Sequence, residues 1–289
     1  MQEFDFQQPT SLSELVAILD DTGGRVIAGG TDVIPRMRHD LFSAATLVDA
    51  SRVAELNFLE KRDDEIAIGA LTTHDQVMRS DLLMAANPAL VQAAASVGCN
   101  QTRQRGTLGG NLANASPAAD CVPPLSVFNA RLRLLAKDGE RILPLADFFS
   151  GPGKTQLKST EIIHSILFKP LDGAWGAAFQ KMGKRSGMAI AVVSAAAALT
   201  LDETGTITDA RIALGSVAPT VVRSPKAEAM LKGQQPTPTS IKEAAQACSA
   251  DISPISDVRS SAEYRGHAAT VLVERAIQQA LDQARRKLA

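Results

Sequence analysis

The chain has 289 residues, of which 45% are hydrophobic and 21% charged, an ordinary globular mixture whose length predicts about two domains. Lysine and arginine number 30 and aspartate and glutamate 31, so the formal net charge is -1. With this balance and only 4% aromatic residues, the chain lacks the basic surplus and the stacking rings of a nucleic-acid-binding protein.

The first 55 residues predict a small unit of one helix and two strands. Ser11 and Glu14 have the spacing of a capping box, and apolar residues recur along one helical face over residues 10–21. A short apolar run at 25–28 ends at two glycines and predicts a buried strand, and residues 45–50 predict another.

Residues 56–170 predict a second unit of mixed helices and strands. A glycine-rich, weakly hydrophobic stretch lies within it at 100–120. The expected elements are a strand at 65–70, a helix at 73–79 capped by Thr73, a helix from Pro88 to near Gly98, a short helix opened by Pro123 and Pro124, a hairpin of 130–136 and 140–143, and a strand at 161–168.

Pro170 to Gly173 looks like a linker, so we place a domain boundary near residue 171. The chain then divides into residues 1–55, 56–170 and 171–289. The third part is expected to contain strands at 174–182, 189–201 and 208–217, and helices at 226–231, at 239–248 with Thr239 or Ser240 as the cap, and at 261–288.

Two glycine pairs, each beside hydroxyl, amide and carboxylate side chains, are the strongest candidates for a binding site. We call residues 28–32, Ala-Gly-Gly-Thr-Asp, the first glycine segment, and residues 106–111, Gly-Thr-Leu-Gly-Gly-Asn, the second glycine segment. Adjacent glycines let backbone N–H groups converge on an anion, and the neutral donors around them suit a pyrophosphate. Two tight turns without a ligand are the alternative, and the pattern alone leaves both open.

Motifs of the common catalytic and metal sites do not occur in the sequence. The four histidines have no HExxH spacing, and there is no GxSxG or GxxxxGK[ST] motif. We therefore predict no catalytic side chain and no metal ligand. Lys181, Lys184 and Arg185 form a basic cluster, which indicates either a solvated loop or a positive rim near a phosphate or a flavin.

Cys99, Cys121 and Cys248 lie far apart, so this chain by itself cannot hold a four-cysteine iron–sulfur cluster. An odd number of dispersed cysteines fits a reducing compartment. The N-terminus has no secretory signal pattern, and the longest apolar run, 189–201, is shorter than the roughly 20 residues of a membrane span. We expect a cytoplasmic protein without a membrane span.

Four segments together carry a specific resemblance to a known family. They are residues 28–32; residues 103–120, which run from Arg-Gln-Arg-Gly-Thr to Ser-Pro-Ala-Ala-Asp; residues 179–195; and residues 262–265, Ala-Glu-Tyr-Arg. In order and spacing they resemble the FAD-binding subunits of the molybdenum hydroxylases, which include the medium subunits of bacterial carbon monoxide dehydrogenase and xanthine dehydrogenase. The resemblance covers almost the whole chain.

The resemblance implies an α+β fold with a two-part FAD-binding domain of the vanillyl-alcohol-oxidase (PCMH) type. A C-terminal domain with a three-stranded antiparallel sheet and helices would follow. The implied partners are a large molybdopterin-binding subunit and a small subunit with two [2Fe-2S] clusters, in a dimer of heterotrimers. Electrons from a substrate oxidised at molybdenum would pass through the clusters to FAD and then to an external acceptor, with NAD, oxygen and quinone left open.

The resemblance also assigns cofactor contacts residue by residue. The glycine segments would contact the pyrophosphate and the ribityl chain, Asp120 the adenosine ribose, and Lys181 the isoalloxazine ring. At Ala189, many family members have aspartate or tyrosine near the flavin, whereas alanine can neither stack nor accept a hydrogen bond. The implied FAD-binding residues are Arg25, Val26, Ile27, Ala28, Gly29, Gly30, Thr31, Asp32, Val33, Val97, Thr107, Leu108, Gly109, Gly110, Asn111, Asn114, Asp120, Ile163 and Lys181.

The leading interpretation is therefore an electron-transferring flavoprotein subunit of a molybdenum-containing oxidoreductase. A self-contained FAD-dependent oxidoreductase is the alternative, although the short chain and the lack of a convincing acid–base residue near the glycine segments argue against it. A third interpretation is a flavin-free assembly subunit whose glycine segments are only turns.

Overall fold

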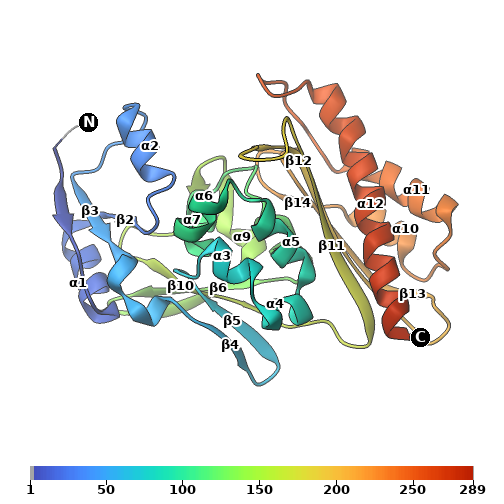
Figure 1. The fold of residues 1–289 in the computed structure, drawn as a ribbon, viewed down its shortest axis with the longest axis horizontal. Helices are drawn as coiled ribbons and strands as arrows, with labels where there is room; N and C mark the ends of the chain where they lie inside the picture. Colours follow the sequence, from blue (N-terminus) through green and yellow to red (C-terminus); the bar gives the residue numbers. More distant parts are fainter. Residues whose placement is uncertain (1–2, 289) are drawn as a thin grey trace.

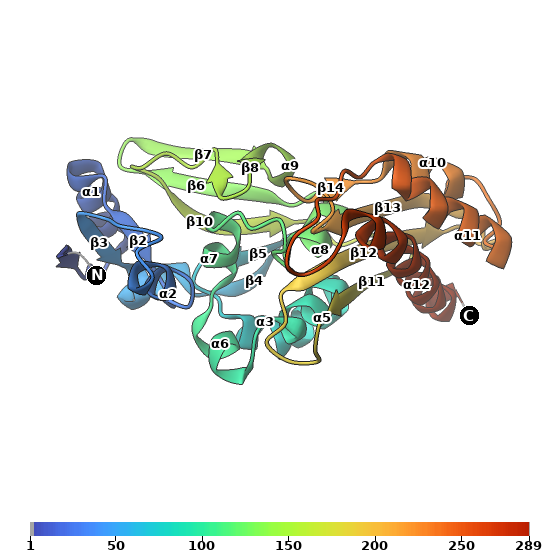
Figure 2. The ribbon, with the colours of Figure 1, turned by 90° about the horizontal axis from the view of Figure 1, so that it is seen from above.

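The computed structural model describes residues 3–288, and its three main sheets follow one another along the long axis of the molecule (Figure 1). Residues 1, 2 and 289, the outermost ends of the expected first and third domains, lie outside the described part. The view from above shows the same order, with the N-terminal sheet and the last helix at opposite ends (Figure 2).

A three-stranded parallel sheet lies at the N-terminal end. Its strands are β1 (Asp5–Gln7), β2 (Arg25–Ile27) and β3 (Thr46–Asp49), in the spatial order β1-β3-β2. Helix α1 (Leu12–Thr22) begins where Ser11 Oγ accepts the N–H of Glu14, and it ends at Gly23, whose φ of 58° is left-handed. Its buried face packs on Val48 of β3.

A five-stranded antiparallel sheet forms the middle of the molecule. Its strands are β4 (Leu59–Arg62), β5 (Glu65–Gly69), β10 (Ile162–Phe168), β6 (Arg131–Ala136) and β7 (Gly139–Pro144), given in spatial order. One face packs against helices of residues 74–127, because Ile68 and Leu132 share a hydrophobic core with Leu90 and Leu125. These helices lie above the strands in Figure 1.

Short elements connect and cover this middle sheet. The helices are α3 (His74–Met78), α4 (Asp81–Ala86), α5 (Pro88–Ser96), α6 (Asn100–Arg105), α7 (Leu108–Ala113), α8 (Val122–Val127) and α9 (Leu145–Phe148). Strands β8 (Phe149–Gly151) and β9 (Lys154–Thr155) pair with each other, and single 3₁₀ turns occur at Ala50–Arg52 and Ala54–Leu56.

A four-stranded antiparallel sheet and three helices form the C-terminal end. The elements are β11 (Ala174–Gly183), β12 (Ala191–Leu201), β13 (Ile207–Gly215), β14 (Val222–Arg223), α10 (Pro225–Leu231), α11 (Pro238–Ala247), a 3₁₀ turn (Cys248–Ala250) and α12 (Ala262–Leu288). Helix α12 packs on the sheet through small side chains, with Ala276 and Ala280 in one core with Ala195 and Ala197. Small residues at this interface let the helix lie close to the strands.

Two details of the C-terminal part differ from the expectation. Its sheet has four strands and not three, because Val222–Arg223 pairs with β13, and a two-residue strand is too short to show an alternating pattern. The cap of α11 is Thr237 and not Thr239 or Ser240, since Pro238 occupies the first helical position and Thr237 Oγ1 accepts the N–H of Ser240.

The glycine-rich stretch at 100–120 contains two short helices, α6 and α7, that the sequence pattern did not predict. The other expected helices and strands occur within a few residues of their expected positions. Across residues 3–288, no helix combines the length and the apolar character that crossing a membrane requires.

Candidate functional site

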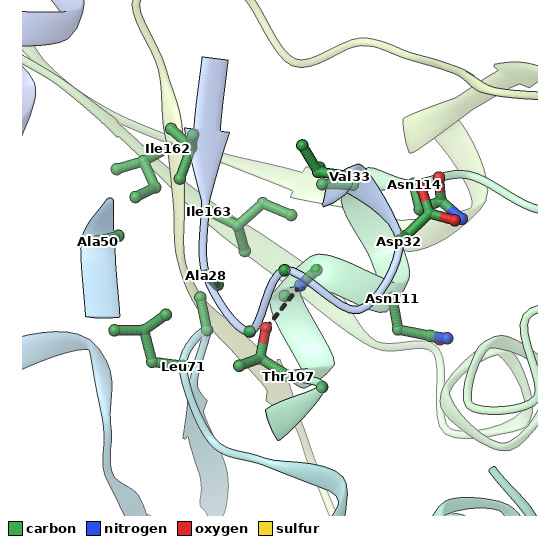
Figure 3. A pocket seen from close by; sticks show the side chains of 18 of the residues that line it. Ala28, Asp32, Val33, Ala50, Leu71, Thr107, Asn111, Asn114, Ile162 and Ile163 are labelled. Carbon is green, nitrogen blue, oxygen red and sulfur yellow. Dashed lines mark hydrogen bonds between the residues drawn. The ribbon is translucent and has the colours of Figure 1, made fainter. Parts of the chain in front are cut away.

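A cavity of about 290 Å³ lies where the end of β2, the start of α7 and the segment before β10 meet (Figure 3). Its two ends differ in character. At one end, Ala50 and Ile162 belong to a single hydrophobic cluster. At the other end, the guanidinium of Arg36 lies 3.5 Å from Asp32 Oδ2 and 3.4 Å from Asn114 Oδ1. The cavity suits an elongated ligand with one apolar and one polar part.

The first glycine segment presents backbone N–H groups that have no internal partner. Strand β2 ends at Ile27, and the chain turns at Gly30, whose φ of 69° is a left-handed conformation that glycine adopts without strain. Helix α2 (Val33–Arg38) follows. Within the described part of the chain, the N–H groups of residues 29–33 have no hydrogen-bond acceptor, and all five residues line the cavity. Consecutive free N–H groups of this kind bind anions.

Close packing joins the first glycine segment to the residue that precedes the second. A Cβ atom on Gly29 would stand 1.8 Å from the carbonyl oxygen of Arg105, so no residue but glycine fits without a backbone shift. A Cβ on Gly106 would stand 3.3 Å from Thr31 Oγ1. Gly29 is therefore required for the contact between the two segments, whereas Gly30 is required for the turn.

The second glycine segment is the start of helix α7 and not a free loop. Thr107 caps the helix, because its Oγ1 accepts the N–H of Gly110 at 3.1 Å (Figure 3). The N–H groups of Leu108 and Gly109 donate to backbone carbonyls of residues 70–72. The backbone of this segment has no free donor at these positions, so the segment contributes side chains to the cavity.

Polar side chains complete this end of the cavity. Asn111 Oδ1 is a buried acceptor without a partner among residues 3–288. Arg25 also lines the cavity, and burial together with the charge of Arg36 lowers its pKa. The guanidinium groups of Arg25, in the lining, and of Arg36, beside the lining, outnumber the carboxylate of Asp32 at this end. This balance favours an anionic ligand.

Most of the residues that the sequence analysis assigned to the site come together at this cavity. Those lining it are Arg25, Val26, Ala28, Gly29, Gly30, Thr31, Asp32, Val33, Val97, Thr107, Gly109, Gly110, Asn111, Asn114 and Ile163. Four assigned residues are not part of the lining. Ile27 and Leu108 belong to hydrophobic clusters, and Asp120 and Lys181 form an ion pair with each other.

The Asp120–Lys181 ion pair is buried, with side chains 8% and 10% exposed. Lys181 Nζ also donates to the carbonyl oxygen of Ser96 at 3.0 Å. Burial raises the pKa of Asp120 to about 6, and the opposing effect of the lysine is smaller. Asp120 Oδ1 is buried and has no hydrogen-bond partner within the described residues.

The sequence analysis did not name His74 or the segment 155–161 as cavity residues. His74 is 3% exposed and lies at the start of α3. The segment forms a wall that Glu161 fixes, since its carboxylate binds Arg141 at 2.8 Å and accepts the N–H of Lys158 at 2.9 Å. Neither feature belongs to a glycine pattern or a recognisable motif, so only contacts between distant segments reveal them.

These donors fit a cofactor with a pyrophosphate and ring systems, as FAD has. The free N–H groups of residues 29–33 match phosphate oxygens, the unpartnered Asn111 Oδ1 can accept from a hydroxyl, and the apolar end can take a ring. Within residues 3–288, no cluster of three or more His, Cys, Asp or Glu side chains could hold a metal ion.

Comparisons with known families agree with this fit. A family model described as the FAD-binding domain in molybdopterin dehydrogenase matches residues 2–169. A second model, described as the carbon monoxide dehydrogenase flavoprotein C-terminal domain, matches residues 177–280.

Individual relatives resemble the chain over nearly its full length. The alpha subunit of the 6-hydroxypseudooxynicotine dehydrogenase complex of Paenarthrobacter nicotinovorans is 33% identical, over 98% of this chain and 96% of its own. The xanthine dehydrogenase FAD-binding subunit of Escherichia coli O157:H7 is 30% identical, over 99% of each chain.

A solved structure extends the likeness to three dimensions. A chain of carbon monoxide dehydrogenase from Hydrogenophaga pseudoflava, in a form lacking the Mo-pyranopterin moiety of the molybdenum cofactor, matches with a TM-score of 0.93. The two chains are 30% identical, and the match covers 98% of each. From its sequence, its fold and its cavity, the chain belongs to the FAD-binding subunits of the molybdopterin dehydrogenases, the oxidoreductases known as molybdenum hydroxylases.

Proposed function

We propose that this subunit relays electrons from [2Fe-2S] clusters in a small partner subunit, through FAD in the cavity, to an external acceptor. The observation that carries the proposal is the row of free N–H groups at residues 29–33, in a cavity whose far end is apolar. When bound, FAD supplies a ring that takes up and releases electrons. The lining carboxylates Asp32 and Glu161 are paired with arginines, which suits binding rather than proton transfer.

Residues of the cavity would hold the cofactor by complementary chemistry. The N–H groups of residues 29–33 would donate to the pyrophosphate, and Arg25 would add positive charge beside it. Asn111 Oδ1 would accept from a hydroxyl. The apolar side chains around Ile162 would exclude water from one ring system. Asp120 and Lys181 stay predicted contacts, and the free Asp120 Oδ1 is the atom that supports this assignment.

The partners in this proposal are a large molybdopterin-binding subunit and the small iron–sulfur subunit, in a dimer of heterotrimers. A formal net charge of -1 gives little long-range attraction, so a permanent packed interface is expected. Exposed apolar side chains support such an interface. Val258 is 94% exposed, Ile255 68% and Ile190 60%.

Two further assignments belong to the same proposal. We place the subunit in the cytoplasm, which the three unpaired cysteines support. We also propose that residues 1–55, 56–170 and 171–289 are the structural units of the chain. Separate parallel, antiparallel and C-terminal sheets support these limits.

The proposal is tested with the full chain and with its complex. The chain, purified alone and incubated with FAD, should show a flavin spectrum after gel filtration. Under anaerobic conditions, xanthine, glyceraldehyde or carbon monoxide should not reduce this flavin, whereas dithionite should. The chain, tagged and isolated from its native host, should carry iron and molybdenum in partner subunits.

Two outcomes would overturn the proposal. If the isolated chain retained no flavin at any FAD concentration, the cavity would not be the cofactor site. If xanthine, glyceraldehyde or carbon monoxide reduced the flavin of the isolated chain within seconds, the chain would be a self-contained oxidoreductase.

A further inference from the structure

His74 is a buried titratable side chain at the cavity for which neither the fold nor the family resemblance assigns a role. It is 3% exposed and belongs to the cavity lining. The backbone N–H of His74 donates to the carbonyl oxygen of Gly106 at 3.0 Å, and the imidazole ring lies against that glycine. Since Gly106 also lies beside Thr31, the imidazole stands at the junction of the two glycine segments.

One ring nitrogen of His74 faces a buried cysteine. The distance from Cys121 Sγ to His74 Nδ1 is 3.6 Å, and the Cys121 side chain is fully buried. Burial, reinforced by the charge of Asp120, raises the pKa of this thiol well above its usual range, so the sulfur keeps its proton. A protonated thiol has an S–H to donate, and we assign the bond the direction from S–H to Nδ1, with Nδ1 as the acceptor.

The charge state of the imidazole follows from its surroundings. Burial, together with the nearby positive charge of Arg103, lowers the pKa of His74 to about 4, so the ring is neutral at pH 7. A neutral imidazole carries one proton. With Nδ1 accepting from Cys121, that proton is on Nε2, and the side-chain hydrogen bond of His74 to the described residues is the one through Nδ1.

We infer that the Cys121–His74 pair fixes the imidazole as a neutral donor whose Nε2–H hydrogen-bonds an oxygen of the cofactor in the cavity. The inference rests on the proposed FAD site. It adds a side-chain donor beside the backbone donors of residues 29–33. This buried position favours a neutral donor. An imidazolium here would lose its hydration and would also be repelled by the positive charge of Arg103.

Nitrogen NMR of the full chain with ¹⁵N-labelled histidine tests the inference without a mutation. Before FAD is added, His74 should show the signals of a neutral ring protonated at Nε2. Adding FAD should move the Nε2 signal and slow the exchange of its proton, while Nδ1 changes little. His164, which does not line the cavity, is the internal control and should not respond.

Substitutions at His74 and Cys121 provide a second test of the inference. His74→Phe should weaken FAD binding about tenfold, the equivalent of about 1.4 kcal/mol, whereas His164→Phe should leave it unchanged. Cys121→Ala removes the donor to Nδ1 and should give a mixture of His74 tautomers before any FAD is added. Cys121→Ser supplies an O–H donor at the same place and should restore the single tautomer.

The outcomes separate this inference from the proposed function. If the wild-type chain binds FAD but the Nε2 signal does not respond, or if His74 is protonated at Nδ1, the inference is wrong while the FAD site stands. If the wild-type chain binds no FAD, the proposed function fails first. Retention of full affinity by a folded His74→Phe variant would also refute the inference.

Discussion

The cavity and the C-terminal layer of β11, β12 and α12 use small residues for opposite purposes. In the C-terminal layer, Gly176 lies so close to α12 that a Cβ there would stand 2.0 Å from the carbonyl oxygen of Ala280. In the first glycine segment, residues 29–33 keep their N–H groups free. One region closes its core completely, and the other keeps donors for a ligand. A glycine in a sequence does not by itself distinguish these two uses.

Buried charges are incompletely paired in both regions. In the C-terminal layer, Arg265 is 2% exposed and donates to the carbonyl oxygens of Val192 and Ser216 and to Asp257, but its Nε is buried without a partner within residues 3–288. Near the cavity, the Asp120–Lys181 pair leaves one carboxylate oxygen without a partner. An acceptor without a partner costs stability in the free protein unless a ligand satisfies it. Because each region holds such an atom, incomplete pairing does not by itself mark the binding region.

The largest expected effect is on stability when the buried pair is broken. Lys181→Met leaves the Asp120 carboxylate buried without its counter-ion, which should lower the free energy of unfolding by about 3–5 kcal/mol. Urea unfolding at pH 7 measures this loss in the free energy of unfolding. Lys169→Met breaks the exposed pair with Asp64, which solvent screens, and should cost far less. Equal losses in the two variants would show that burial does not distinguish the pairs.

The two regions should also respond to pH with opposite signs. The pKa of Asp120 is raised from 3.8 to about 6, so the folded chain holds its proton longer than the unfolded chain does. Stability should fall as pH rises from about 4 to 6, by about 3 kcal/mol, and then level off. Asp120→Asn should remove this fall, as shown by urea unfolding of both proteins across that range.

Asp257 in the C-terminal layer provides the opposite case. Hydrogen bonds from Arg259 and Arg265 hold the pKa of this carboxyl well below its usual range. Its contribution to stability is complete above about pH 4, and it is lost as the pH falls toward the folded pKa. Asp257→Asn should therefore flatten the acid limb of the stability profile. An unchanged acid limb in this variant would contradict the assignment.

Adding one methyl group at each closely packed glycine compares the regions directly. Gly176→Ala and Gly29→Ala both place a Cβ within 2.0 Å of a backbone oxygen, so each should cost about 1–3 kcal/mol of stability. Only Gly29→Ala should also impair FAD binding, because it displaces the first glycine segment. Flavin retention after gel filtration, measured beside urea unfolding, separates the two results. Loss of flavin from both variants would instead indicate a global change.

Gly110→Val should affect the cofactor more than the fold. Gly110 does not have a positive φ, and a Cβ there would contact only Thr107 Oγ1, at 3.0 Å, so the added bulk lies toward the cavity. FAD affinity should fall about tenfold, or about 1.4 kcal/mol, with the far-UV circular dichroism spectrum retained. Gly187→Val, in open space away from the lining, is the control. Equal affinity of both variants would contradict the role of Gly110.

Replacing the cysteines should have the smallest effect. Cys99, Cys121 and Cys248 are unpaired, and each can be changed to serine with little change in volume. The triple serine variant should keep the flavin spectrum, and the isolated wild-type chain should contain no iron. Stoichiometric iron in the isolated chain would contradict this prediction.

Local sequence patterns were enough to predict most of the periodic elements and to single out the two glycine segments. The caps Ser11 and Thr73, the hairpin of β6 and β7, and the long α12 follow local rules of hydrogen bonding and periodicity that act within a few residues. These patterns did not predict that the second glycine segment begins a helix. That helix start depends on Thr107, whose Oγ1 accepts the N–H of Gly110. The order of motifs also indicated the family.

The packing of distant segments determines which groups meet at the cavity and which of them remain unpaired. His74 and Cys121 are 47 residues apart, and Lys181 and Asp120 are 61 apart, so no local pattern could join them. Whether an N–H group of residues 29–33 is free depends on every acceptor that the fold brings near it. Local sequence sets what a residue can offer, but burial and the partners left after packing decide what it does offer to a ligand.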